Sequence, residues 1–184
     1  MHLPEWAERG RGVGKWDGTE RPPFAETPGP GQESVWDFPR PPRIESDARH
    51  IVIRVGGTVI ADTMAALRVL ETASPPTFYL PPSDVRMELL RPASGASRCE
   101  WKGTAQDWSV RTQEGESAED AAWSYAEPFE DFAPLRDHLA FYPNRVDCAL
   151  DGEQVRAQAG GFYAGWITRD VVGPFKGDPG SGGW

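Results

Sequence analysis

The sequence predicts a mainly β protein: a single antiparallel domain with one to three short helices and an extended arm at each end. Short β-branched and aromatic runs alternate with tight turns, at the spacing typical of hairpins. No long stretch has the apolar period of about 3.6 residues that marks an amphipathic helix. The 184 residues include 20 Gly and 18 Pro, which requires many turns and extended connections. A chain of this length has room for one ordinary domain with extensions.

The two ends of the chain differ in composition from the centre. We expect an N-terminal arm over residues 1–32, a core domain over 33–157 and a C-terminal arm over 158–184. The first 43 residues contain eight Pro and six Gly, so we expect neither a helix nor a central strand there. Both arms are also rich in aromatic residues, which disordered tails usually lack. We therefore expect the arms to be ordered around Trp36 and Trp166 and to lie against their own core or a second subunit.

The first half of the core is expected to contain a hairpin, a helix and a short strand. Residues 50–55 and 58–61 are β-branched runs on either side of Gly56-Gly57, a two-residue turn signal. Residues 65–70 are the best helix candidate, with Asp62 or Thr63 as the N-cap and Pro75-Pro76 as the limit. The next elements are expected to be a strand over residues 77–80 and one helical turn within 83–90.

The second half of the core is expected to consist mostly of strands. Strands are expected over residues 99–101 and 106–111 on either side of Lys102-Gly103, and then over 121–126, 138–142, 146–150 and 154–157. A second short helix is expected over residues 130–135. Pro143-Asn144 and Asp151-Gly152 mark turns between the last strands. The pattern favours an antiparallel β-rich core over alternating strands and helices.

The charge distribution limits the classes of partner. The net charge is −9, and residues 113–153 contain eleven acidic residues against two arginines, so the rest of the chain is balanced. A nucleic-acid binder neutralises phosphates with a basic face, which this sequence does not supply, so we expect no nucleic-acid partner. No apolar run approaches the roughly 18 residues of a membrane span, and the N-terminus lacks a signal-like apolar region. We therefore expect a cytoplasmic protein with no membrane partner.

Cysteine and histidine are too sparse to predict a metal site. The two cysteines, Cys99 and Cys148, form no CxxC motif, and no HExxH motif is present. We expect no structural metal and no cofactor. If a metal were found, the two cysteines together with His50 and His138 would be the candidate ligands. Both cysteines lie in expected strands, where a small buried thiol is the simplest interpretation.

Residues 99–103, Cys-Glu-Trp-Lys-Gly, are the segment with the most chemistry. In a strand, side chains two positions apart share a face, so Cys99 and Trp101 are expected to point one way and Glu100 the other. Trp123 and Tyr125 follow at the same spacing. Such tryptophans either fill a small β core or form a flat-walled pocket for a planar or cationic ligand. Lys102 is the only lysine between residues 44 and 157, and it has chemistry to offer only where it is partly buried.

Several motifs occur in the order found in one bacterial family. They are the segment 35–42, Glu71-Thr72 with Pro75-Pro76, Tyr79-Leu80-Pro81 with Asp84-Val85, Cys99-x-Trp101-Lys102-Gly103, Ala122-Trp123-Ser124-Tyr125 and Phe141-Tyr142-Pro143. On these motifs the chain resembles the domain of unknown function 427 family over roughly residues 33–175. It departs from the family at Phe38, where relatives often have Tyr, and at Glu100, where they often have Pro.

The resemblance implies a β-rich domain of the β-tent kind, similar to methionine sulfoxide reductase B and the thalidomide-binding domain of cereblon. Proteins with that fold usually hold zinc on two CxxC pairs, and both pairs are missing here, so zinc is not carried over. No established activity comes with the family. Its nucleotidyltransferase-like label would require clustered carboxylates for Mg²⁺ beside a phosphate-binding turn. Glu119 and Asp120 are adjacent instead, and no Gly-rich turn precedes them.

Three functions remain open for this sequence. The first is a small-molecule-binding module with an aromatic cleft for a planar or anionic ligand, formed by Glu71, Tyr79, Trp101, Lys102, Trp123 and Tyr125. In this cleft, Lys102 and Glu71 are expected to compensate each other's charge. The second is an enzyme with Cys99 or Lys102 as nucleophile or base, close to Glu71, Asp84 or His138. The third is a structural or interaction protein whose aromatic arms form a homodimer.

Overall fold

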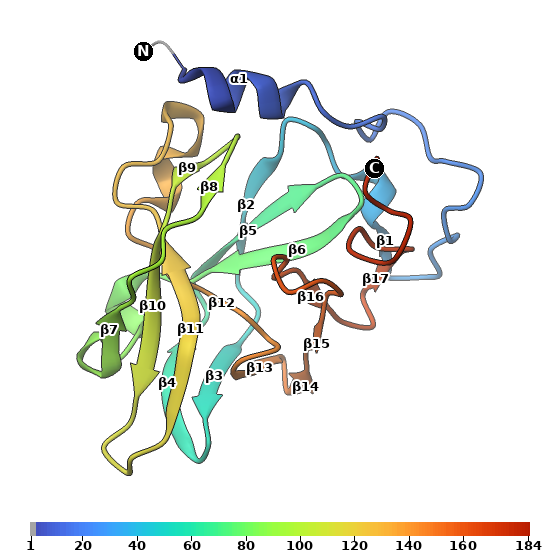
Figure 1. Ribbon diagram of the computed structural model, residues 1–184. Coiled ribbons are helices and arrows are strands. Elements are labelled where there is room, and N and C mark those ends of the chain that lie inside the picture. The colour runs from blue at the N-terminus through green and yellow to red at the C-terminus, as the bar shows by residue number, and fades with distance from the viewer. Residues whose placement is uncertain (1–2) are drawn as a thin grey trace.

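The computed structural model describes residues 3–184, and strands make up most of its regular structure (Figure 1). One short pair of strands is parallel, and the other paired strands are antiparallel. The mainly β, antiparallel fold class predicted from the sequence is therefore confirmed. None of the helices within the described residues has the length and apolar character needed to cross a membrane.

Two four-stranded sheets and one three-stranded sheet form the body of the molecule. Their strand orders are β14-β13-β3-β4, β12-β11-β10-β7 and β2-β5-β6. In chain order the strands are β2 (Arg43–Asp47), β3 (Ile51–Val55), β4 (Thr58–Thr63), β5 (Ala66–Glu71), β6 (Ser74–Tyr79), β7 (Leu90–Pro92), β10 (Gln106–Arg111), β11 (Ser117–Ser124), β12 (Ala140–Phe141), β13 (Asp147–Leu150) and β14 (Glu153–Gln154).

Short strand pairs and short helices complete the fold. The pairs are β1 (Glu33–Ser34) with β17 (Val171–Val172), β8 (Arg98–Cys99) with β9 (Gly103–Thr104), and β15 (Arg156–Ala157) with β16 (Trp166–Ile167). The helices are the α-helix α1 (Glu5–Arg11) and the 3₁₀ helices η1 (Val35–Asp37), η2 (Pro82–Asp84), η3 (Met87–Leu89) and η4 (Glu130–Leu135). The β1–β17 pair is the parallel one, and it joins the segment directly after the N-terminal arm to the C-terminal arm.

Residues with positive φ close the two hairpins of the β14-β13-β3-β4 sheet. Gly56 has a φ of +56° in the turn between β3 and β4. Asp151 and Gly152 have φ values of +48° and +78° between β13 and β14. Such values suit two-residue turns whose twist matches that of the flanking strands. Both hairpins predicted from these turn residues are confirmed.

The helix expected over residues 65–70 is wrong, because this segment forms β5. The cap-like hydrogen bond expected at Thr63 is present, since the Ala65 backbone N–H donates to Thr63 Oγ1 at 3.0 Å. A central strand follows it, paired with β2 on one side and β6 on the other. Ladder hydrogen bonds on both sides outweigh the helix propensity of Ala and Leu, which is a preference of only a few tenths of a kcal/mol per residue.

The expectation that the first 43 residues contain no helix is also wrong. Helix α1 lies between Pro4 and Gly12, in a stretch that has no proline until Pro22. Arg9 pairs with Glu5 one turn earlier at 2.8 Å, and Ala7 is buried against the rest of the protein. The proline and glycine content of the whole segment hid a short local run of helix-compatible residues.

The other elements occur close to their predicted places with shifted bounds. Strand β6 begins at Ser74 and runs through Pro75 and Pro76, which an edge strand tolerates because its outer side needs no backbone N–H. Strand β11 begins at Ser117, four residues before the predicted start. The helical turn expected within 83–90 occurs as η2 and η3, and the helix expected over Glu130–Leu135 occurs as η4.

Trp166 anchors the C-terminal arm in the main core. Its side chain is 1% exposed and belongs to the same buried cluster as residues of the two four-stranded sheets. The indole ring lies 4.8 Å from the ring of Phe78 in β6, and its Nε1–H donates to the Phe141 carbonyl at 3.3 Å. The arm is therefore ordered at this tryptophan, and it lies against its own core.

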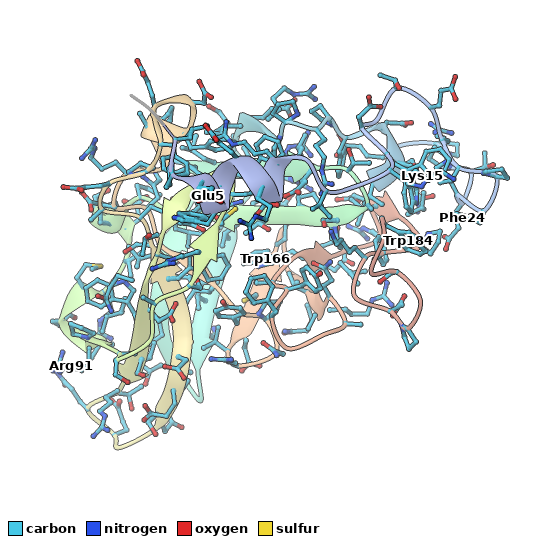
Figure 2. All side chains as sticks on the ribbon, turned by 45° about the horizontal axis from the view of Figure 1, so that its top comes forward. Glu5, Lys15, Phe24, Arg91, Trp166 and Trp184 are labelled. Carbon is cyan, nitrogen blue, oxygen red and sulfur yellow. The ribbon has the colours of Figure 1, made fainter. Side chains whose placement is uncertain are left out.

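The two arms also pack against each other through an aromatic cluster. Trp36 is fully buried, and the rings of Phe24 and Trp184 lie 5.3 and 5.1 Å from it. Phe24 and Trp184, labelled in Figure 2, stack on each other at 5.1 Å. Trp16 completes the cluster at 6.3 Å from Trp36. The N-terminal arm is thus ordered around Trp36, again within its own chain.

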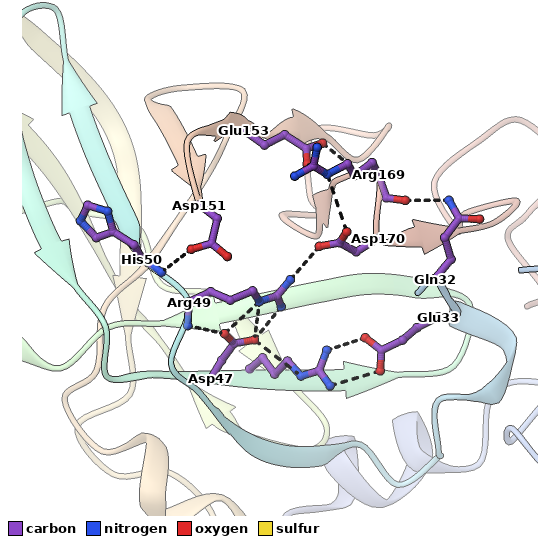
Figure 3. Close-up of polar contacts among 10 residues, drawn as sticks. Gln32, Glu33, Asp47, Arg49, His50, Asp151, Glu153, Arg169 and Asp170 are labelled. Carbon is purple, nitrogen blue, oxygen red and sulfur yellow. Dashed lines mark hydrogen bonds and ion pairs between the residues drawn. The ribbon is translucent and has the colours of Figure 1, made fainter. Parts of the chain in front are cut away.

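A network of ion pairs fixes the arms to the β2-β5-β6 sheet (Figure 3). Arg49 contacts Asp47 at 2.6 Å and Asp170 of the C-terminal arm at 3.0 Å. Arg68 in β5 contacts Glu33 of β1 at 2.6 Å and also pairs with a carboxylate of β2. Arg49 links β2 to the C-terminal arm, and Arg68 links the sheet to β1, which pairs with β17 of that arm.

We predict that Trp166→Ala lowers the free energy of unfolding by about 3–5 kcal/mol, because it leaves a cavity and an unpaired carbonyl. Urea unfolding measures the change. Phe162→Ala in the same arm is the control, since Phe162 is 68% exposed and its loss should change stability by about 0.5 kcal/mol or less. Equal effects of the two substitutions would contradict the assignment of Trp166 as the anchor.

We predict a pH-dependent effect of Asp47→Asn. Burial raises the pKa of Asp47, but hydrogen bonds from Arg49 outweigh it and hold the pKa below the ordinary 3.8. The carboxylate therefore contributes stability above the unfolded-state pKa, and this contribution is lost as the pH falls through the lower folded-state pKa. The substitution should lower the free energy of unfolding by about 1–3 kcal/mol at neutral pH.

The destabilisation by Asp47→Asn should shrink in acid, because the wild-type carboxyl is then protonated as well. Urea unfolding at neutral pH and below pH 3.8 measures both values. Asp131→Asn, at an exposed position in η4, should have little effect at either pH. If Asp47→Asn lowered the free energy of unfolding equally at both pH values, the charge of Asp47 would not contribute to stability.

Candidate functional site

A pocket of about 230 Å³ lies between the β2-β5-β6 sheet, the turn between β8 and β9, the end of β11 and the C-terminal arm. Five of the six residues predicted to bind a ligand line it: Glu71, Tyr79, Lys102, Trp123 and Tyr125. Cys99, the other candidate nucleophile, lines it as well. These side chains come from four separate segments, which the strand pairing brings to one place.

Trp101 is the predicted site residue that does not line the pocket. Strand β8 ends at Cys99, so residues 100–102 form a turn and the alternation of faces expected for a strand stops there. Trp101 is buried under helix α1, where the Arg11 guanidinium lies 5.0 Å from its ring. Glu100, expected on the opposite face from Cys99, lines the pocket instead.

Lys102 presents an unpaired ammonium group to the pocket. Within residues 3–184 its Nζ makes no hydrogen bond or ion pair, and it lies 6.0 Å from the centroid of the Phe132 ring. Burial by itself lowers the pKa of Lys102. The acidic groups around it, first Tyr79 and Cys99 and then Tyr125 and Glu71, outweigh burial and hold the pKa well above 10.5. The direction of this shift keeps Lys102 protonated, as a lysine with an ordinary pKa also is at neutral pH.

Tyr79 presents a phenol that has no partner. The residue is 0% exposed, and its Oη has no hydrogen-bond partner in the described protein. Burial raises the pKa of Tyr79 to about 12, even though Lys102 acts in the opposite direction. Burial also raises the pKa of Tyr125 well above 10.0. Both phenols are therefore neutral at physiological pH and retain a proton to donate.

Aromatic rings enclose this part of the pocket. Tyr79 meets Trp123 edge to face at 6.0 Å, and the Tyr125 ring lies 6.4 Å from Tyr79. On its other side, Trp123 contacts Tyr142 at 4.6 Å. The rings belong to one buried cluster, so the wall of the pocket is also part of the core.

Glu71 forms its ion pair with Arg40, and not with Lys102 as expected. The Arg40 guanidinium lies 2.9 Å from Glu71 Oε1 and also donates to the Val13 carbonyl at 2.7 Å. Among the acidic groups that raise the pKa of Lys102, Glu71 comes last in size. The main compensation of the Glu71 charge therefore comes from Arg40, in the segment that precedes β2.

The C-terminal arm supplies lining residues that the sequence analysis missed, among them Gln158, Tyr163 and Lys176. Gln158 ties the arm together, because its Nε2 donates to the Lys176 carbonyl at 2.6 Å and its Oε1 accepts from the Gly165 N–H at 3.0 Å. Burial, followed by the nearby Arg40 charge, lowers the pKa of Lys176. The aromatic content of this arm was the only sequence signal that it packs against the core.

The pocket carries more positive than negative groups, although the chain has a net charge of −9. Arg98, Lys102 and Lys176 line it, against the carboxylates of Glu71 and Glu100. Arg40, which does not line the pocket, already pairs with Glu71. The positive charge of the lining therefore exceeds its uncompensated negative charge by more than three cations against two carboxylates indicates. The arrangement suits an anion.

The remaining candidates for chemistry lie elsewhere. Asp84 accepts a hydrogen bond from Thr63 at 2.6 Å, and His138 contacts the Arg136 carbonyl at 3.1 Å; neither lines the pocket. Cys148 is buried in β13. Within residues 3–184, no group of three or more His, Cys, Asp or Glu side chains is arranged to hold a metal ion.

Comparison with known proteins identifies the family. A family model described as a domain of unknown function (DUF427) matches residues 43–152. The match covers more than half of the chain, so the protein belongs to this family. A search of curated proteins gives no match. The matched residues include Glu71, Tyr79, Cys99, Lys102 and Trp123, whereas the part of the pocket formed by the C-terminal arm lies outside the match.

We predict that Tyr79→Phe leaves stability unchanged or raises it by about 1 kcal/mol, because it removes a buried hydroxyl that has no partner. Thr72→Val is the contrasting variant. Thr72 is equally buried, but its hydroxyl donates to the Phe38 carbonyl, so its loss should cost about 1–3 kcal/mol. Thermal or urea unfolding compares them. A loss of stability in Tyr79→Phe as large as that in Thr72→Val would mean that Oη has a partner.

Proposed function

We propose that this protein binds a small, planar ligand with an anionic or carbonyl group in the pocket between the sheets and the C-terminal arm. The observation that carries the proposal is the Tyr79 hydroxyl, a buried group of a lining residue that has no partner among the described residues. The half-buried Lys102 lines the same pocket. A buried polar group without a hydrogen-bond partner is costly to fold, and such groups are rare unless something else satisfies them. A ligand oxygen that accepts from both groups would do so.

The shape and the walls of the pocket support the ligand class. An apolar cavity of about 150 Å³ accommodates benzene, so a pocket of about 230 Å³ has room for one substituted ring. Trp123 and Tyr125 offer aromatic surface for packing against such a ring. The positive excess in the lining favours a negative substituent over a positive one.

An enzyme with Lys102 as its general base is less well supported. A general base works best when its pKa lies near the working pH, and Lys102 has its pKa held far above that range. Lys102 suits the role of a fixed positive charge. The proposal also needs no second subunit, since Trp36 and Trp166 are buried in their own chain.

We predict that wild-type protein binds benzoate and salicylate in preference to benzamide and benzylamine, and that Lys102→Met weakens carboxylate binding at least about tenfold. A charge-assisted hydrogen bond contributes about 1.5–3 kcal/mol, which corresponds to a factor of ten or more. Tryptophan fluorescence titration follows binding because Trp123 lines the pocket.

Lys15→Met is the matched control for this measurement, because Lys15 is exposed beside Trp16 and lies outside the pocket. It should bind benzoate as wild-type protein does. Benzylamine binding as tight as benzoate binding, an unchanged affinity in Lys102→Met, or no binding by either carboxylate at millimolar concentration would each refute the proposed ligand class.

A further inference from the structure

We propose that Cys99 is a covalent attachment site: its thiol adds to an α,β-unsaturated carbonyl compound held in the pocket, while Tyr79 and Lys102 hold the carbonyl oxygen. This inference rests on the proposed function, because the same pocket must first bind the compound. It goes further by assigning a bond-forming residue and a class of electrophile to the site.

The two cysteines differ sharply in access. Cys148 is 0% exposed in β13, and burial raises the pKa of its thiol. Cys99 is partly exposed at the end of β8 and faces the pocket. Its sulfur forms no disulfide within the described residues. Cys99 is therefore the thiol that a bound molecule can reach.

Lys102 lies in the same pocket as Cys99. It follows Cys99 across the turn between β8 and β9, and both residues line the pocket. An ammonium group placed there donates to the carbonyl oxygen of a compound that the thiol attacks.

The Tyr79 hydroxyl, which also supports the proposed function, is the observation that points to a reacting carbonyl. Addition to the β-carbon moves charge onto the carbonyl oxygen, and fixed donors aimed at that oxygen stabilise the transition state. Tyr79 lines the pocket together with Cys99 and Lys102, and its hydroxyl is buried without a partner among the described residues. The pocket thus combines a thiol with two free donors, which is the set that conjugate addition requires.

The step is balanced without an oxidant or a second reactant. The sulfur of Cys99 forms a bond to the β-carbon, and the π electrons of the C=C bond shift to give an enolate. The enolate oxygen accepts hydrogen bonds from Tyr79 and Lys102. The proton lost by the thiol is then taken up at the α-carbon, so that one S–H and one C=C π bond are replaced by one C–S and one C–H bond.

Two thiol reagents test the inference. N-Ethylmaleimide reacts by conjugate addition and places charge on a carbonyl oxygen, whereas methyl methanethiosulfonate reacts by thiol exchange and does not. Both are added to the folded full-length protein, and intact mass with peptide mapping gives the rate at each cysteine. We expect N-ethylmaleimide to modify Cys99 with a saturable rate and to leave Cys148 unmodified, and we expect Cys99→Ser to abolish the adduct.

Tyr79→Phe separates a role in the reaction from simple access. It should slow the N-ethylmaleimide reaction at least about tenfold, as expected for loss of a donor to the developing oxyanion, and leave the methanethiosulfonate rate unchanged. Equal slowing with both reagents, no slowing with either, or equal labelling of Cys148 would overturn the inference. Benzoate titration of Cys99→Ser keeps the two proposals distinct: if this variant binds benzoate while the maleimide rate is independent of Tyr79, only the covalent step fails.

Discussion

The burial of Trp166 is the contact on which the pocket depends. This one indole, packed on Phe78 and hydrogen-bonded to the Phe141 carbonyl, holds the C-terminal arm against the core. Complete burial of such a side chain contributes roughly 1.5–3 kcal/mol. The arm in turn closes one side of the pocket and brings Lys176 to it, ten residues further along the chain. The apolar packing of Trp166 on Phe78 thereby positions Lys176 in the pocket.

The ion pairs of Arg49 and Arg68 have a different role from this apolar anchor. Partly buried ion pairs give little net stability, since desolvation cancels much of the attraction, but they restrict geometry because an unpaired charge is costly. Arg49 holds Asp170 of the C-terminal arm, and Arg68 holds Glu33 beside it in the β1–β17 pair. The two ion pairs therefore favour the observed register of β1 and β17, and with it the position of the C-terminal arm on the sheet.

Short sequence motifs predicted the elements whose conformation depends only on neighbouring residues. The turn at Gly56-Gly57 could be predicted because two glycines between β-branched runs favour a two-residue hairpin turn. The strand conformation of residues 65–70 could not be predicted in this way, because it depends on pairing with β2 and β6. The convergence of Tyr79 and Lys102 was predicted from their motifs, whereas Trp101 was misplaced because the strand ends two residues early. Lys176 was missed, since nothing local links it to Glu71.

One feature of the site works against folding, and this supports a role in binding. The Tyr79 hydroxyl has no partner, and it costs free energy that a purely structural core would avoid by using an apolar side chain. The acidic surface does not cancel the positive pocket, because charges beyond about 8 Å are largely screened at physiological ionic strength. A bound anion would interact mainly with the lining, where cations outnumber carboxylates. Unsatisfied donors, aromatic walls and local positive charge therefore favour the same kind of ligand.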